Sequence, residues 1–256
     1  METTWKLSRV FRSINPLSAP EIYYRHFSDH EDVIEIPPTL GSYDQPWRFE
    51  LLSSTNDPRT GFTGDVMIDR QSGHAVILYK GMDVPFRDEG NGRMGFLRDS
   101  FTAAKAWWRG GPNWQTPLAE KVYLDTVSHP DVKSVEVVGF SLGTLHVNCM
   151  TAKYGVKGTV LSDLGITDRG IKNLFNRKAA GDVEGAVSNL KKNLTVLRMA
   201  LDLIPPLFGV SEHRGRVVQL DDGDFPNLSG VFHRARTYSE KARRFAQQVQ
   251  AVLAFG

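Results

Sequence analysis

The stretch Val135-Glu-Val-Val-Gly-Phe-Ser-Leu-Gly143 decides the fold, because an apolar run leads directly into a Gly-x-Ser-x-Gly turn. Residues 144–154 continue with a helical pattern that Gly155 closes. A serine between a strand and a helix predicts a sharp, strained turn that presents its hydroxyl as a nucleophile. Glycine is expected at both flanking positions, since a Cβ there would collide with a neighbouring element. The alternative is an ordinary turn of a β-α unit, and the flanking strand and helix favour Ser141 as a nucleophile.

Strand and helix patterns alternate on both sides of this turn. Patterns typical of strands occur at residues 47–52, 61–69, 74–79, 135–138, 158–163 and 216–220. Patterns typical of helices occur at residues 96–108, 116–128, 144–154 and 237–255. The strands at 61–69 and 74–79 form a predicted hairpin with Gly73 in its turn. The alternation predicts an α/β protein with a mostly parallel central sheet flanked by helices.

Two segments fall outside this alternation. Residues 1–45 contain four prolines and several charged runs, and we interpret them as an N-terminal extension or arm that packs on a domain of residues 46–256. Residues 165–212 are predicted to form a helical insertion, which is a usual place for a lid or substrate-binding cap. Its apolar residues are predicted to share one helix face: Leu194, Leu197, Leu201 and Ile204.

A serine nucleophile needs a histidine base and an orienting acid, which in this arrangement follow it in the chain. His233 comes after the last predicted strand, nine residues beyond Asp224. Active-site residues of parallel sheets gather at the carboxyl ends of the strands, which favours these two residues as partners of Ser141. Asp222 is the alternative acid.

A rival pairing combines His213 with Asp163 or Asp168, which follow the preceding predicted strand. His213 precedes the last strand instead of following it, so the same positional rule disfavours it. His146 lies on the helix that the serine turn opens, too close to Ser141 to serve as its base. We interpret it as a packed or surface residue.

Two backbone N–H groups are predicted to stabilise the oxyanion of a tetrahedral intermediate. Leu142 supplies one of them at the start of the helix, where backbone N–H groups point outward. The second should come from the loop after an earlier strand, where Gly81 and Met82 are the candidates. A simple turn is the alternative role for this glycine.

The order of these segments resembles the class 3 lipase family and related bacterial lipase-like α/β-hydrolases, over about residues 61–238. The family's Arg-Gly-Thr-Asp-type turn corresponds to Lys80-Gly-Met-Asp83, and its acidic helical stretch corresponds to Asp99-Ser-Phe101. The family's serine elbow corresponds to residues 139–143, and its Asp-x-Val-Pro-type loop corresponds to Asp224-Phe-Pro before His233.

The resemblance implies an α/β-hydrolase fold and ester or lipid-ester substrates. It also implies a triad of Ser141, Asp224 and His233, with an oxyanion hole formed by the N–H groups of Met82 and Leu142. The chain departs from the family pattern in that turn and before the serine. Those departures are Lys80 for arginine, Met82 for threonine or serine, and Phe140 for histidine. A backbone donor survives the change to Met82, so the oxyanion hole is weakened but not excluded.

Composition excludes several other classes of protein. The 256 residues carry 31 basic and 29 acidic side chains, and a net charge of +2 gives no global attraction for nucleic acid. Cys149 is the only cysteine, which excludes a disulfide within the chain and disfavours a thiolate metal site. We therefore expect no metal and no cofactor. Residues 1–20 contain no continuous apolar stretch, so neither a signal peptide nor a membrane span is predicted. Cytoplasmic residence is the default expectation, with signal-independent secretion as the alternative.

The leading hypothesis is a serine esterase of the lipase or phospholipase type, acting on a small-molecule or lipid ester without a nucleic-acid partner. A triad acting on thioesters or amides is a variant of this hypothesis. The alternative is a non-catalytic α/β-hydrolase-fold protein that binds or assembles with a protein partner through the N-terminal arm. Residues 234–244 are locally basic and predict a solvated helix face, with contact to a membrane surface as the alternative.

Overall fold

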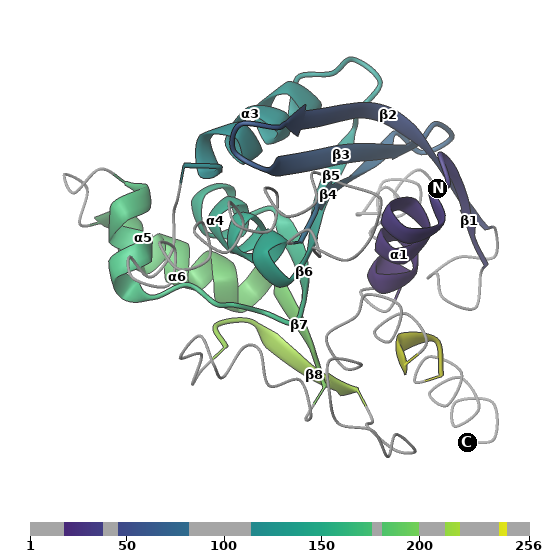
Figure 1. Ribbon diagram of the computed structural model, residues 1–256. Coiled ribbons are helices and arrows are strands. Elements are labelled where there is room, and N and C mark those ends of the chain that lie inside the picture. The colour runs from purple at the N-terminus through teal and green to yellow at the C-terminus, as the bar shows by residue number, and fades with distance from the viewer. Residues whose placement is uncertain are drawn as a thin grey trace, which may run out of the picture.

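The computed structural model describes residues 18–37, 46–81, 114–175, 181–199, 213–220 and 241–244. In these ranges eight strands form one sheet in the order β1 to β8, and helices cover both of its faces (Figure 1). The strands are β1 (Val33–Ile36), β2 (Trp47–Asp57), β3 (Phe62–Asp69), β4 (His74–Tyr79), β5 (Ser134–Phe140), β6 (Lys157–Leu161), β7 (Leu194–Met199) and β8 (Arg216–Leu220). The helices are α1 (Ala19–Asp29), α3 (Thr116–Val127), η3 (Ser141–Gly143), α4 (Thr144–Tyr154), α5 (Asp168–Leu174) and α6 (Gly181–Asn193).

The sheet changes character at β4. Strands β1 to β4 pair in antiparallel fashion, and β4 to β8 pair in parallel. The predicted hairpin is confirmed, with Asp69 opposite His74 and Gly73 in the left-handed region at φ 71°. Helices α3, α4 and the α5–α6 pair each occur between consecutive parallel strands in the chain. The predicted α/β class, with a central sheet that is parallel over five of these eight strands and flanked by helices, is confirmed.

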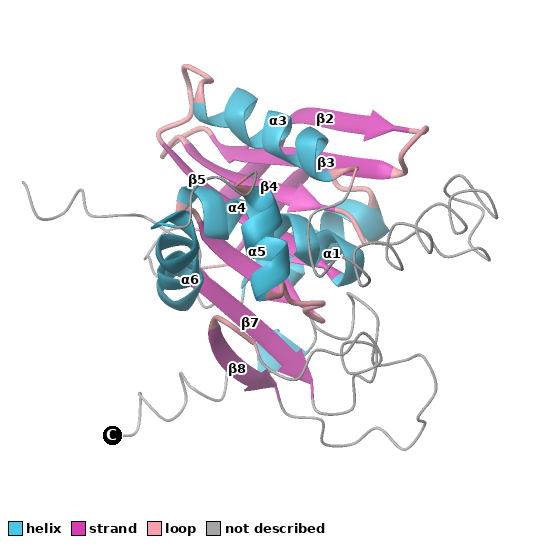
Figure 2. Cartoon of the chain, turned by 90° about the vertical axis from the view of Figure 1, so that its left-hand side faces the viewer, coloured by secondary structure: helices cyan, strands magenta, loops and turns pink. Residues whose placement is uncertain are grey.

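Two apolar cores lie on opposite faces of the sheet. Along β4, Ala75, Ile77 and Tyr79 belong to the core beneath α3, α4, α5 and α6. Val76 and Leu78 belong to the other core, beneath α1 and residues 241–244 (Figures 1 and 2). A strand buried on both faces has no polar alternation, which explains the uninterrupted apolar run in the sequence.

One predicted helix is wrong. Residues 194–199 form β7, hydrogen-bonded between β6 and β8, although the sequence predicts a helix face that starts at Leu194. Leu194 and Val196 enter one core and Leu197 enters the other. Apolar residues three positions apart can therefore be buried on opposite faces of a strand, and the same spacing fits one face of a helix. Leu201 and Ile204 lie outside the described residues.

The two segments set apart by the sequence are also integrated into the sheet. Helices α5 and α6 lead from β6 to β7, and α6 packs against α4, so residues 168–193 form a crossover between neighbouring parallel strands. The segment of residues 1–45, predicted as an arm, contributes helix α1 and the edge strand β1. Ala19 and Ile22 of α1 are fully buried against the domain. Of the helix predicted over residues 237–255, residues 241–244 are described and are helical.

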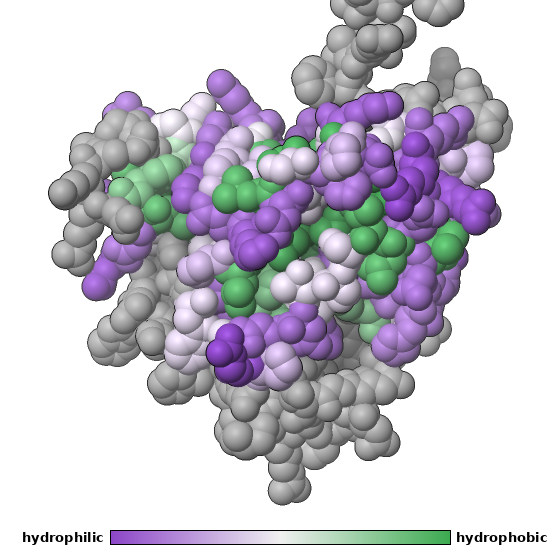
Figure 3. All heavy atoms as spheres, turned by 90° about the horizontal axis from the view of Figure 1, so that it is seen from above, coloured by the Kyte–Doolittle hydropathy of each residue, from purple (hydrophilic) through white to green (hydrophobic). Residues whose placement is uncertain are grey.

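Exposed apolar side chains are scattered over the described surface. The large ones are Val33, Trp114, Leu124, Val127 and Val217. Val33 and Val217 lie on the edge strands β1 and β8, whereas Leu124 and Val127 lie on α3 and Trp114 directly precedes that helix. On the face shown in Figure 3 apolar groups are interspersed with hydrophilic ones. A few exposed apolar residues are ordinary on protein surfaces and do not by themselves mark a binding surface. No described helix is long and apolar enough to cross a membrane.

Candidate active site

Ser141 lies at the apex of the turn between β5 and η3, as the sequence predicts. Its φ is 51°, in the left-handed region that residues with a Cβ rarely adopt, and the residue is 5% exposed. A Cβ on Gly139 would lie 2.6 Å from the carbonyl oxygen of Gly143. A Cβ on Gly143 would lie 2.8 Å from the carbonyl carbon of Tyr79. Both glycines are therefore required, and the strain at the serine is held in place by tight packing on either side.

Thr144 ties this turn to the loop after the next strand. Its Oγ1 donates a hydrogen bond to the carbonyl oxygen of Ser141 at 2.6 Å and accepts one from the backbone N–H of Leu164 at 3.0 Å. Thr144 is fully buried. A buried hydroxyl with both partners satisfied fixes the turn relative to β6, which lies beside β5 in the sheet.

Of the three candidate oxyanion donors, the structure describes Leu142 and Gly81. Leu142 is buried in the first turn of the helical segment, where N–H groups have no partner within the helix. Gly81 is excluded as the second donor, because its N–H donates to the Tyr23 hydroxyl at 2.7 Å. Met82 is the remaining candidate from that loop and lies outside the described residues.

His146 is a packed residue and not a base. It is 2% exposed, its Nε2 lies 3.2 Å from Oε1 of Gln115, and its ring meets Phe62 and Tyr79 edge-on. Burial lowers the pKa of this imidazole to about 4. The prediction that His146 plays no catalytic part agrees with this environment.

The structure brings His213 of the rival pairing into contact with one of its two candidate acids, Asp163. His213 Nδ1 lies 2.9 Å from Oδ2 of Asp163, and both side chains are buried. Oδ1 of Asp163 accepts hydrogen bonds from the side-chain amide of Asn148 at 2.8 Å and the backbone N–H of Gly165 at 2.9 Å. Asp168 instead pairs with Arg214 at 2.7 Å.

Asp163 follows the carboxyl end of β6, the strand beside β5, which carries the serine turn. Gly158 of β6 pairs with Leu194 of β7, and Thr195 of β7 pairs with Arg216 of β8, so the amino ends of the three strands lie side by side. His213 precedes the amino end of β8, whereas Ser141 follows the carboxyl end of β5. The contact with Asp163 nevertheless places the His213 ring at the loop after the carboxyl end of β6, so His213 and Asp163 stay the alternative base and acid.

The preferred base and acid, His233, Asp224 and Asp222, lie outside the described residues. The structure nevertheless changes the set of candidate acids, because residues 194–199 are a parallel strand. The first carboxylate in the chain after that strand is Asp202, which a helix over residues 194–204 would not place at a strand end. Asp202 also lies outside the described residues.

Other chemistries find little support in the described residues. No group of three or more His, Cys, Asp or Glu side chains among them is arranged to hold a metal ion. Cys149 is fully buried, and burial raises the pKa of its thiol to about 12. A thiol in this state is a poor nucleophile, because the thiolate is the reactive form.

No protein-family model matches the sequence, and no curated protein matches it. Among solved structures, the chain is similar to Lip2 lipase from Yarrowia lipolytica, with 16% identity and a TM-score of 0.42. That match covers 68% of this chain and 66% of the Lip2 chain, just under two thirds. It is also similar to a mutant form of MDLA from Penicillium cyclopium, with 12% identity and a TM-score of 0.44 over 91% of this chain and 87% of that chain. Identities and TM-scores this low identify no reaction.

The described geometry itself has the arrangement of an α/β-hydrolase. A strained serine follows the carboxyl end of a strand in a parallel sheet, and a buried helix begins directly after it. Such a turn holds the hydroxyl at the carboxyl edge of the sheet and sets helix N–H groups beside it. The arrangement suits nucleophilic attack on a carbonyl carbon.

Proposed function

We propose that the chain is a serine hydrolase that cleaves carboxylic esters through an acyl-enzyme on Ser141. The observation that carries this proposal is the left-handed φ of 51° at Ser141, enforced by two glycines that admit no Cβ. Backbone strain of this kind costs on the order of 1–3 kcal/mol and persists only where the surroundings impose it. Ser162 has a similar φ of 57° after β6, and what distinguishes Ser141 is the pair of glycines that pack against the turn and the helix that begins directly after it.

The reaction follows from this geometry in two steps. Ser141 Oγ attacks the acyl carbon of the ester while its proton passes to the base, and the N–H groups of Leu142 and Met82 stabilise the oxyanion. The carbon–oxygen bond to the alcohol breaks, and the base returns the proton to the leaving oxygen. Water then loses a proton to the same base and attacks the acyl carbon. The bond from that carbon to Ser141 Oγ breaks, and the base returns the proton to Oγ, which releases the acid and restores the serine.

His233 is the proposed base, because it follows β8 in the chain as the positional rule requires. Three acids are candidates to hold its imidazole. Asp222 and Asp224 follow β8, and Asp202 follows β7. Asp202-Leu-Ile-Pro205 has the four-residue spacing of the family's Asp-x-Val-Pro-type loop, whereas Asp224-Phe-Pro226 is one residue shorter. We therefore add Asp202 to the two acids proposed from sequence.

The lipase or phospholipase character of the substrate rests on the resemblance in sequence.

The first test is labelling with a fluorophosphonate probe, with mass spectrometry to locate the adduct. Labelling on Ser141 that disappears in Ser141→Ala supports the proposal. A folded protein that stays unlabelled and hydrolyses no ester refutes it and favours a non-catalytic binding or assembly role.

A second set of variants assigns the base and the acid. His233→Ala is expected to lower kcat for a p-nitrophenyl ester by roughly 10⁴-fold, while His213→Ala leaves Ser141 reactive. If His213→Ala abolishes the activity and His233→Ala does not, His213 is the base and Asp163 is the acid. Asp202, Asp222 and Asp224 are then replaced by Asn one at a time. The acid is the residue whose replacement lowers kcat about as much as replacement of the base does. Esters, thioesters and amides of short and long acyl chains define the substrate class.

A further inference from the structure

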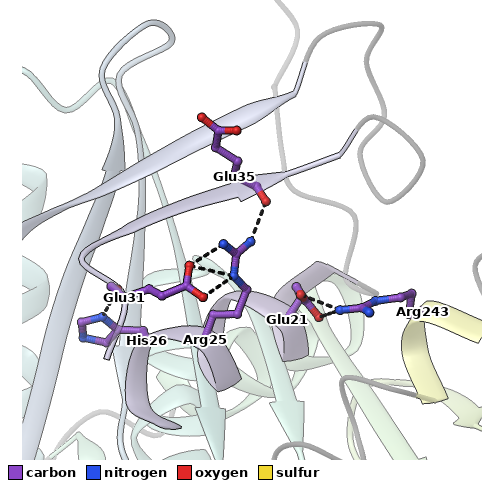
Figure 4. Close-up of polar contacts among 6 residues, drawn as sticks. All are labelled: Glu21, Arg25, His26, Glu31, Glu35 and Arg243. Carbon is purple, nitrogen blue, oxygen red and sulfur yellow. Dashed lines mark hydrogen bonds and ion pairs between the residues drawn. The ribbon is translucent and has the colours of Figure 1, made fainter. Parts of the chain in front are cut away.

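Helix α1 is fixed to other parts of the domain at both of its ends (Figure 4). Arg25 pairs with Glu31 and donates a hydrogen bond to the backbone carbonyl of Glu35 in β1 at 2.7 Å. Near the start of the helix, both carboxylate oxygens of Glu21 accept hydrogen bonds from Arg243 at 2.7 Å. The helix is thereby tied to the edge strand and to the C-terminal helical segment.

A buried contact also joins α1 to the antiparallel half of the sheet. His26 Nε2 lies 2.7 Å from Oδ2 of Asp65 in β3, and His26 Nδ1 lies 3.1 Å from the carbonyl oxygen of Glu31. Burial lowers the pKa of His26, but hydrogen bonds to Asp65 and to the Glu31 carbonyl outweigh it, and the pKa is raised overall. The charged ring can donate from both nitrogens, so α1 has little freedom to shift on the sheet.

Between these contacts along α1, the Tyr23 side chain reaches residues next to the candidate active site. It is 3% exposed, and its hydroxyl accepts the backbone N–H of Gly81 at 2.7 Å. Its ring centroid lies 5.9 Å from that of Phe140, the residue before the nucleophile, and 4.9 Å from that of Phe27. One side chain of α1 therefore contacts both the loop after β4 and the strand end that carries Ser141.

Gly81 has no room to move toward the serine turn. A Cβ on this residue would lie 2.9 Å from the carbonyl oxygen of Phe140 and 3.4 Å from Cβ of Ser141. Packing against the turn holds Gly81 on one side, and the hydrogen bond that its N–H donates to the Tyr23 hydroxyl holds it on another. The next residue in the chain is Met82, whose N–H is the proposed second oxyanion donor.

We propose that Tyr23 is a positioning residue for the oxyanion hole, because its hydroxyl fixes the Gly81 peptide at a set place beside Ser141. The inference rests on the proposed function and extends it to α1, a helix in the segment that the sequence marks as an extension. The Tyr23 hydroxyl acts through Gly81 and does not touch the substrate. Without it, the Gly81 peptide loses one of its two restraints beside the serine turn, and we expect weaker stabilisation of the oxyanion.

Tyr23→Phe tests this, because it removes the hydroxyl and keeps the ring on Phe140. We expect kcat for a p-nitrophenyl ester and the rate of Ser141 phosphonylation to fall about tenfold, with KM changed less than twofold. Amide hydrogen exchange at Gly81 should accelerate in the same variant. Tyr154→Phe is the matched control, since it removes a hydroxyl bonded to Glu120 at the far end of α4 and should alter none of these readouts.

The outcomes separate the inference from the proposed function. Wild-type protein that labels at Ser141, with a Tyr23→Phe variant of unchanged rate and unchanged Gly81 exchange, overturns the positioning role and leaves the hydrolase standing. Equal losses in Tyr23→Phe and Tyr154→Phe also overturn it, since they would reflect general destabilisation. Wild-type protein that never labels overturns the hydrolase and the positioning role with it, whatever the exchange at Gly81.

Discussion

Gly143 offers a quantitative test of the packing at the serine turn. Its φ of −61° and ψ of −23° are ordinary helical values, so alanine at this position carries no backbone strain. The obstacle is steric. A Cβ would lie 2.8 Å from the carbonyl carbon of Tyr79 and 2.9 Å from the carbonyl oxygen of Lys80, inside the 3.0 Å that real Cβ atoms keep. Both are backbone atoms, so no side-chain rotation relieves the contact.

The expected cost of Gly143→Ala follows from this overlap. Overpacking a core costs typically about 1–3 kcal/mol and occasionally more, and a backbone obstacle places this variant near 3 kcal/mol of lost stability. Gly185 is the matched control in α6, where a Cβ meets nothing within 4 Å. Glycine in a helix interior is less stable than alanine by roughly 0.5–1 kcal/mol, so Gly185→Ala should stabilise the protein by that amount.

Urea unfolding followed by circular dichroism measures both changes. The two variants should differ by about 4 kcal/mol, which corresponds to a Tm difference on the order of 10 °C for a chain of this size. Phosphonylation of Ser141 should slow in Gly143→Ala and stay unchanged in Gly185→Ala. A free energy of unfolding for Gly143→Ala within about 0.5 kcal/mol of the wild type, the usual scatter for an unconstrained surface site, would show that the Cβ meets no fixed obstacle.

Three further predictions concern buried groups. Burial lowers the pKa of His146 to about 4, below its unfolded value of 6.5, so its stabilising effect is complete above that value and declines as the pH falls. Between pH 8 and pH 5 this group should account for about 2 kcal/mol of lost stability, and unfolding of His146→Leu should depend on pH less by that amount. Burial raises the pKa of Cys149 to about 12, so a thiol reagent should modify it only at the rate of unfolding. Rapid modification of one thiol in native buffer would contradict this. Thr144→Val should lose about 1–3 kcal/mol of unfolding free energy and slow phosphonylation, whereas Thr144→Ser should retain most of both. Equal behaviour of the two Thr144 variants would show that the hydroxyl is not what holds the turn.

Local rules made much of the fold predictable from the sequence. The turn at Ser141 needs only a Gly-x-Ser-x-Gly pattern between an apolar run and a helix. The helix from Thr144 to Tyr154 ends at Gly155, whose φ of 66° suits the left-handed cap that glycine adopts readily. The hairpin turn at Gly73 follows from the same conformational freedom. Each of these features depends on residues within a few positions of one another.

The sequence pattern predicted the wrong secondary structure for β7, which is buried on both faces of the sheet. Leu194 and Leu197 have helical spacing, yet they enter opposite cores because residues three apart in a strand point to opposite faces, and both faces of the sheet are covered. Periodicity reports only how a segment is buried, and a strand buried on both faces has no period of its own. The error at β7 also concealed Asp202, since a helix offers no strand end at which to look for an acid.

By itself, the sequence determined the serine turn, the helix after it, the hairpin before it and the α/β class. Only the tertiary structure decided that α1 belongs beside the candidate active site, with the Tyr23 hydroxyl on the N–H of Gly81, 58 residues away in the chain. It alone joined His213 to Asp163, 50 residues apart. Turns and caps are set by φ, ψ and the next few side chains, whereas contacts over such distances depend on how the whole sheet folds together.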